Sequence, residues 1–161
     1  MSIHQTGRSW GTFPLRELVD DVCGPLAMHF SSHSIQTVID IPSSHRITAD
    51  RELLLRAVRN LVLHAIDAMP QGGTMTVISA DGPRAVELEI ADTGPSLTEE
   101  EMHQAVALTS SEQNIVLGWG LAVVGRIAHL HGGDVTTANC PEGGAAFTLR
   151  IPKAPARVAA A

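Results

Sequence analysis

The stretch RNLVLHAIDAMP, residues 59–70, combines an apolar helical run with a single line of polar side chains. Asn60, His64 and Asp67 stand at positions i, i+4 and i+7, so on an α-helix they lie along one face. The other positions are mostly Leu, Val, Ile and Ala, which predicts a helix packed into a core. Taken alone, such a stripe is more often a set of hydrogen-bonded core side chains than a ligand site.

The composition indicates one compact domain. The chain has 161 residues, of which 44% are hydrophobic and 17% charged, and this suits a single fold with a full core. A net charge of −6 and an aromatic content of 3% argue against nucleic acid as the main partner. No apolar run approaches the roughly 20 residues of a membrane span, so we expect no membrane contact from this chain. Cys23 and Cys140 lack ligand-like spacing, which favours reduced, buried thiols and a cytoplasmic location.

The pattern places the ordered domain at residues 12–152, between a loose N-terminal tail, 1–11, and a loose C-terminal tail, 153–161. Apolar residues recur at helical spacing after Pro14, and a strand is expected over residues 36–42. Asp50 is a suitable N-cap for the helix that carries the polar stripe.

Two hairpins are expected from alternating apolar residues. The strands TMTVISA and AVELEIAD, residues 74–80 and 85–92, form the first, and DVTTAN and AAFTLRIP, residues 134–139 and 145–152, form the second. Between the hairpins we expect a short helix and a long helix. Because hairpins outnumber parallel crossovers, the predicted fold class is α/β, specifically an α+β two-layer sandwich. Its sheet is mixed and largely antiparallel, with helices packed on one face.

Three local features lie between these elements. The turn DTGP, residues 92–95, leaves the end of a strand, and GWGL, residues 118–121, places bare backbone amides at a helix N-terminus, where anions bind. Ser96 stands three residues before Glu99, the spacing of a capping box.

His129 and His131 sit where a helix ends, and we expect both to be solvent-exposed.

The order of these motifs resembles that of the ATP-binding catalytic domain of sensor histidine kinases, in the superfamily that includes DNA gyrase. Residues 47–73 are similar to the family's Asn-box helix, residues 90–97 to its first glycine box, and residues 118–135 to its second. The resemblance implies a Bergerat-type ATP-binding fold with ATP and magnesium as cofactors.

The resemblance also implies roles for individual residues. Asp92 would accept the adenine amino group, and Gly94 would keep the base pocket open. Gly118, Gly120 and the amide of Leu121 would face the phosphates. The catalytic positions would be Asn60, which matches the first family Asn, and His64, which stands where the family has its magnesium-ligating Asn. Asp67 would be a further nucleotide contact.

The sequence departs from the family pattern at several of these positions. Imidazole is a poor magnesium ligand, so with His64 as the metal position we expect weak magnesium-dependent ATP binding. Ser96 replaces a glycine, and Asp67 stands where the family often has a cation. Between Arg84 and Arg126 there is no Lys or Arg to meet the γ-phosphate. Residues 109–117 are polar, and we expect them to be the least ordered internal segment.

The resemblance leaves two functions open. In the first, the chain is the catalytic domain of a two-component sensor kinase and transfers the γ-phosphate of ATP to a histidine on a separate dimerisation segment absent from this chain, with a response regulator as the further partner. No His here is followed by Glu or Asp, as the family's acceptor motif requires, so the chain is not self-sufficient. In the second, it is a degenerate regulatory module that binds nucleotide weakly or not at all and acts through protein contacts.

Overall fold

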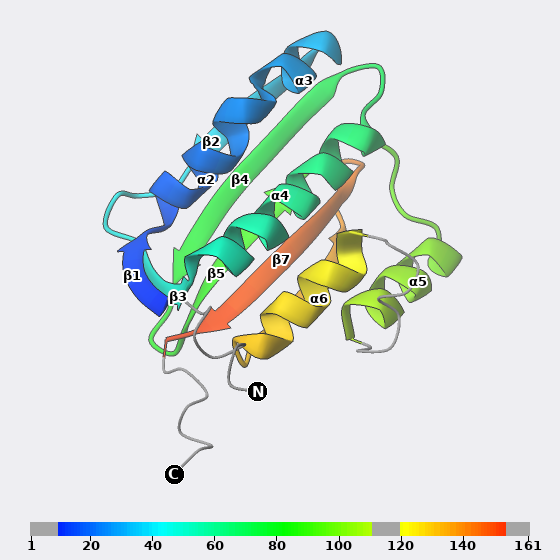
Figure 1. The fold of residues 1–161 in the computed structure, drawn as a ribbon. Coiled ribbons are helices and arrows are strands. Elements are labelled where there is room, and N and C mark those ends of the chain that lie inside the picture. Colours follow the sequence, from blue (N-terminus) through cyan, green and yellow to red (C-terminus); the bar gives the residue numbers. More distant parts are fainter. Residues whose placement is uncertain (1–9, 111–119, 154–161) are drawn as a thin grey trace, which may run out of the picture.

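A computed structural model describes residues 10–110 and 120–153 of the chain. These residues form two layers, with helices α2, α4 and α6 lying across one face of a sheet (Figure 1). The elements in chain order are β1 (Trp10–Pro14), α2 (Leu15–Cys23), η1 (Gly24–Leu26), α3 (Ala27–Ser32), β2 (Ile35–Asp40), β3 (Arg46–Asp50), α4 (Arg51–Ala68), β4 (Gly73–Asp81), β5 (Ala85–Ala91), α5 (Glu99–Ser110), α6 (Gly120–Leu130), β6 (Asp134–Asn139) and β7 (Ala145–Pro152).

The main sheet has five strands in the order β2-β4-β5-β7-β6. β2 pairs in parallel with β4, and the other three pairings are antiparallel. The predicted mixed, largely antiparallel sheet and both predicted hairpins are therefore confirmed. Within β5, Val86, Leu88 and Ile90 are buried, while Glu87 and Glu89 on the opposite face are half-buried. This alternation explains why β5 presents an apolar surface to the helices.

Helix α4 is the central element of the helical layer. Asp50 caps its N-terminus, because the side-chain Oδ1 accepts a hydrogen bond from the Leu53 N–H at 3.2 Å. Leu54, Val58 and Leu61 are at most 1% exposed on its inner face. The predicted cap and the predicted apolar face are both confirmed.

A second, two-stranded sheet joins β1 to β3 and was not predicted. The two strands are antiparallel, with Thr12 opposite Thr48. Trp10 and Gly11, which the sequence pattern assigned to the loose N-terminal tail, belong to β1. Lys153, assigned to the C-terminal tail, donates its N–H to the Arg84 carbonyl at 2.8 Å and pairs with Asp81 at 2.5 Å. The rest of both tails lies outside the described residues.

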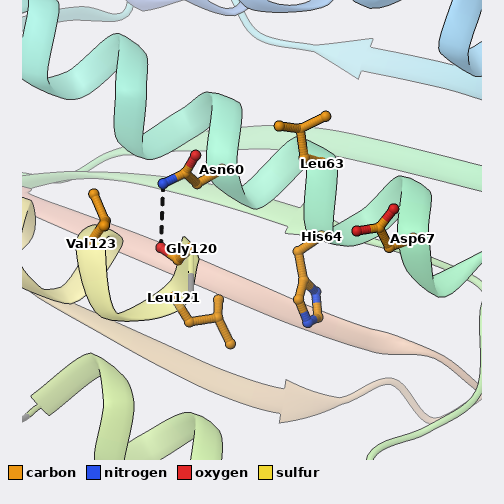
Figure 2. Close-up of a pocket in the computed structure, with 7 residues that line it drawn as sticks. All are labelled: Asn60, Leu63, His64, Asp67, Gly120, Leu121 and Val123. Atoms are coloured by element: carbon orange, nitrogen blue, oxygen red, sulfur yellow. Dashed lines mark hydrogen bonds between the residues drawn. The ribbon is translucent and has the colours of Figure 1, made fainter. Parts of the chain in front are cut away.

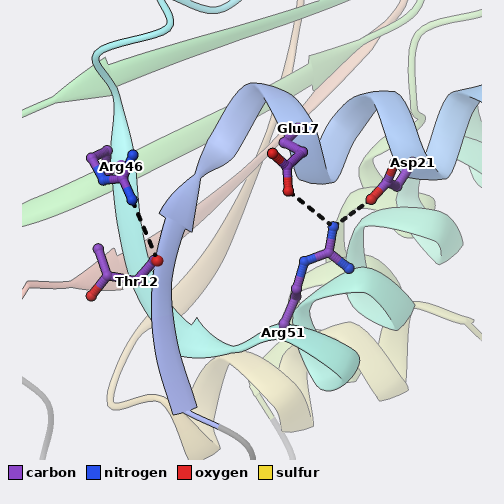
Figure 3. A network of polar contacts seen from close by, with 5 residues as sticks. All are labelled: Thr12, Glu17, Asp21, Arg46 and Arg51. Atoms are coloured by element: carbon purple, nitrogen blue, oxygen red, sulfur yellow. Dashed lines mark hydrogen bonds and ion pairs between the residues drawn. The ribbon is translucent and has the colours of Figure 1, made fainter.

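Charged side chains connect α2 to the start of α4 and β3 to β1. Arg51, the first residue of α4, pairs with Asp21 and, at 3.9 Å, with Glu17 on α2 (Figure 3). The Arg46 guanidinium of β3 donates to the Thr12 carbonyl of β1 at 3.5 Å. All four charged side chains are partly exposed, so these contacts add little stability.

His131 corrects the expectation that both histidines at the end of α6 are exposed. His129 is exposed, but His131 is only 1% exposed. Its Nε2 accepts the N–H of Asp50 at 3.0 Å, which requires the ring proton to be on Nδ1, and Nδ1 donates to the Ile127 carbonyl at 2.8 Å. The Trp10 ring lies 4.8 Å from the His131 ring, centroid to centroid. His131 therefore ties α6 to the start of α4 and to β1.

The cap of α5 is a second correction. α5 begins at Glu99, and the reciprocal pair is formed by Thr98 and Glu101, with the Thr98 N–H bonded to Glu101 at 2.9 Å and the Glu101 N–H bonded to Thr98 at 3.1 Å. Ser96 instead lies 3.5 Å from the Gly144 carbonyl. Of the segment expected to be least ordered, residues 111–117 lie outside the described residues.

Both cysteines are free thiols and are half-buried rather than fully buried. Burial, with a contribution from Asp20, raises the pKa of Cys23 to about 11. None of the described helices combines the length and the apolar character that crossing a membrane requires.

Candidate functional site

The polar stripe of α4 opens onto a cavity of about 410 Å³ between α4 and α6 (Figure 2). The residues that line the cavity are Asn60, Leu63, His64, Asp67, Gly120, Leu121 and Val123. Of the predicted site residues, five therefore come together here. The stripe is not a set of satisfied core hydrogen bonds but one wall of an accessible cavity.

Asn60 and Gly120 bring the two helices together at one end of the cavity. The Asn60 side-chain amide donates to the Gly120 carbonyl at 3.4 Å (Figure 2). A Cβ on Gly120 would lie 3.3 Å from the Cβ of Asn60, so the absence of a side chain permits this approach. Gly120 and Leu121, the first described residues of α6, line the cavity, and the N–H groups in the first turn of a helix can bind an anion.

Asp92 and Gly94 lie outside the lining of this cavity, in the turn after β5. Asp92 is 4% exposed, and its Oδ1 accepts the N–H of Gly94 at 2.9 Å and of Ala145 at 3.4 Å. Burial raises the pKa of Asp92, while these two N–H groups and His64 act in the opposite direction. A Cβ on Gly94 would overlap the carbonyl oxygen of Ala68 at the end of α4. The turn thus holds a buried carboxyl group close to α4.

His64 lies between the cavity and the sheet. Its ring meets the Phe147 ring of β7 edge to face, with centroids 5.0 Å apart at 74°. Its Nδ1 is enclosed, and the described residues provide no hydrogen-bond partner for it. Burial lowers the pKa of His64 below 6.5, although the charges of Asp92 and Asp67 oppose this. The imidazole is therefore neutral near pH 7.

Several lining residues were not predicted as site residues. Leu63 and Val123 form apolar walls, and Phe147 supports the His64 ring. The alternating pattern of residues 145–152 placed Phe147 on the buried face of its strand, but nothing in it indicated that His64 would be the neighbour. Gly118, the remaining predicted phosphate contact, lies outside the described residues.

His64 does not match the ligands that magnesium prefers. Magnesium takes oxygen ligands in octahedral geometry, whereas His64 offers only a ring nitrogen. Asn60 directs its amide nitrogen to Gly120, and Asp67 is exposed at the far end of the stripe. In the described part of the chain, no three His, Cys, Asp or Glu side chains are placed to share a metal ion. At the position of His64, the residue present does not fit a magnesium ion held by the protein.

Comparisons with known proteins show to which family the chain belongs. The profile of the family described as "Histidine kinase-, DNA gyrase B-, and HSP90-like ATPase" matches residues 49–155. The sensor histidine kinase ZraS of Klebsiella oxytoca is 34% identical over 112 residues, which cover 69% of this chain. The adaptive-response sensory kinase SasA of Rippkaea orientalis is 29% identical over 141 residues, or 84% of this chain.

A solved structure extends the likeness to three dimensions. The catalytic domain of histidine kinase ThkA superimposes with a TM-score of 0.81 at 27% identity, covering 91% of this chain and 99% of that one. By contrast, the matched regions span only 24% of the length of ZraS and 36% of SasA. The similarity therefore concerns one domain of those larger kinases. This chain belongs to the family of histidine kinase-, DNA gyrase B- and HSP90-like ATPases, as a histidine kinase ATP-binding catalytic domain.

Proposed function

We propose that this domain binds ATP in the cavity between α4 and α6 and transfers the γ-phosphate to a histidine on a separate dimerisation segment. The observation that carries the proposal is the cavity itself, where Asn60, His64 and Asp67 face the first turn of α6. Relatives such as ZraS are named sensor histidine kinases, and this chain matches a quarter of ZraS, which leaves room there for an acceptor segment and a sensor. A response regulator is then the expected partner of the phosphorylated segment.

Each site residue has a role that follows from its place. The N–H groups of Gly120 and Leu121 would meet phosphate oxygens, and Asn60 holds the first turn of α6 in position through the Gly120 carbonyl. Asp92 would accept the adenine amino group, since two backbone N–H groups fix its carboxyl group at the end of β5. Gly94 keeps the adjoining turn close to α4. Gly118 remains a proposed phosphate contact. We propose residues 12–152, with the rest of β1, as the nucleotide-binding domain.

The charge of the cavity supports a second candidate function. The described lining residues include neither Lys nor Arg, and Asp67 adds a negative charge to the cavity. A regulatory module that has lost nucleotide binding and acts through protein contacts would tolerate this arrangement. A measurement of nucleotide binding distinguishes between the two functions.

Calorimetric titration with ATP and ADP tests the proposal through Asp92→Asn. The substitution removes a carboxylate acceptor while keeping the side-chain size and an oxygen for the Gly94 and Ala145 N–H groups. We expect ATP affinity to fall about tenfold to a hundredfold, as for a buried polar contact worth about 1–3 kcal/mol. The matched control is Asp40→Asn at the exposed end of β2, which should bind like the wild type.

Two results would count against the proposal. If Asp92→Asn binds ATP as tightly as the wild type, Asp92 is not the adenine acceptor. If the wild type binds neither ATP nor ADP, the regulatory function is the better one. Phosphate transfer is measured separately, by mixing the domain with labelled ATP and a two-helix acceptor segment from a related sensor kinase.

A further inference from the structure

His64 is the position at which this cavity departs most from a magnesium site. It is a half-buried imidazole between Asn60 and Asp67 on the polar face of α4, with its ring packed against Phe147. An imidazole and a carboxamide differ in what they offer. The carboxamide has an oxygen that binds hard cations, whereas the neutral imidazole has one nitrogen lone pair and one N–H donor.

The contacts of the ring indicate which nitrogen carries the proton. Nδ1 is enclosed, and within the described residues it has no acceptor, so a proton there would be a buried N–H without a partner. Such unpaired donors are rare in folded proteins. Nε2 is not among the enclosed atoms that lack a partner. The favoured tautomer therefore carries its N–H on Nε2, where it is available to a group that enters the cavity.

The charges around the cavity define what such a donor could do. The described lining residues provide no positive side chain, and Asp67 is the single charged one. Among the described lining residues, a phosphate group would find donors at the first turn of α6, on the side-chain amide of Asn60 and on the ring of His64. Burial keeps the pKa of His64 low, with Asp92 and Asp67 opposing, so this donor is a neutral one near pH 7.

We propose that the cavity takes the phosphates of a nucleotide without a magnesium ion held by the protein, and that Nε2–H of His64 donates directly to a phosphate oxygen in its place. This inference rests on the proposed function, because it assumes that a nucleotide binds between α4 and α6. It adds that His64 determines the metal dependence of binding. Replacement of this single side chain then converts a metal-independent site into a magnesium-dependent one.

Calorimetry of ATP binding tests the inference without relying on phosphate transfer. Wild type, His64→Asn and His64→Ala are titrated at about pH 7.5, where even an exposed imidazole is mostly neutral, in EDTA, in Mg²⁺ and in Mn²⁺. The matched control is His103→Asn, the same substitution at an exposed position of α5. Urea denaturation of each variant checks that it is folded.

We expect wild-type affinity to change less than about twofold between EDTA and Mg²⁺, and His64→Asn to bind about tenfold more tightly in Mg²⁺ than in EDTA. His64→Ala should bind about tenfold more weakly than the wild type in EDTA, because a hydrogen bond to a charged group is lost. His103→Asn should match the wild type under all three conditions.

Four other results would overturn the inference. A wild-type gain in Mg²⁺ as large as that of His64→Asn would show that His64 does not control the metal. A wild-type gain in Mn²⁺ that His64→Asn lacks would make His64 a metal ligand. Equal affinities of His64→Ala and wild type in EDTA would exclude direct donation. Absence of ATP binding in every form would refute the proposed function and this inference with it, a pattern distinct from the other three.

Discussion

Two histidines, one within α4 and one just after α6, occupy opposite kinds of environment. His131, just after α6, is 1% exposed, and each ring nitrogen has a hydrogen-bond partner on a different part of the backbone. His64, in the middle of α4, faces a cavity with an enclosed Nδ1 for which the described residues provide no partner. A buried imidazole is stable when its polar atoms are satisfied. The comparison indicates that His131 stabilises the fold and that His64 is available to a ligand.

The largest expected effect tests this comparison directly. His131→Ala leaves the Asp50 N–H without its acceptor and opens a space in the core, so we expect the free energy of unfolding to fall by about 3 kcal/mol. His64→Ala should cost about 1 kcal/mol or less, since it removes no hydrogen bond to a described residue. Urea denaturation of both variants measures the difference. Equal losses would show that the two histidines are not distinct in role.

Trp10→Ala tests whether the packed region around His131 includes the first residue of β1. The Trp10 ring packs against His131 but is itself 38% exposed, so we expect a loss of about 1 kcal/mol. Met28→Ala is the control, because Met28 is 81% exposed on α3 and should change stability little. If Trp10→Ala costs no more than Met28→Ala, the Trp10 ring adds no stability to the region around His131.

The pH dependence of stability tests whether burial lowers the pKa of His64 in the folded protein. Because burial holds the folded-state pKa of His64 below 6.5, its neutral form favours the folded state, and this contribution is present above pH 6.5 and lost as the pH falls through the folded pKa. The wild type should therefore lose more stability than His64→Asn on acidification. The difference between these two losses should be smaller than the loss caused by Trp10→Ala. Asp92 acts in the opposite direction, since its pKa is raised mainly by burial, but both proteins contain it.

Urea denaturation of the two proteins at several pH values between about 7.5 and 5.5 measures this difference. Parallel stability curves for wild type and His64→Asn would mean that His64 titrates alike in the folded and unfolded states. The comparison with His131 would then rest on hydrogen bonding alone.

The smallest effect is expected at the charged contacts between α2 and α4. Arg51→Lys keeps the positive charge near Glu17 and Asp21 but loses the planar guanidinium, and all three side chains are at least a third exposed. We expect a change below about 0.5 kcal/mol that diminishes further in high salt. A loss comparable to that of His131→Ala, measured in the same urea assay, would show that these contacts stabilise the start of α4 as much as the buried ring does.

Much of the architecture followed from local patterns. The helical spacing of residues 59–70 predicted α4 with its polar face, and Asp50 was correctly predicted as its N-cap. Alternating apolar residues predicted both hairpins. In contrast, the β1–β3 pairing was missed, because Thr12 and Thr48 are 36 positions apart and neither short strand shows a pattern of its own. The cap of α5 was assigned to Ser96, although Thr98 satisfies the same spacing rule two residues later.

For the candidate site, too, the sequence predicted the local features and missed those that depend on distant segments. Asn60, His64 and Asp67 were predicted to share a face because that depends only on the helical repeat, and the structure confirms it. That this face opens onto a cavity depends on Gly120 of α6 lying opposite Asn60. The sequence alone thus determined which faces of the elements are apolar and which residues share them, since both depend on local periodicity. Only the tertiary structure decided that His131 is satisfied and that His64 faces a cavity, because hydrogen-bond partners and open space come from segments far apart in the chain.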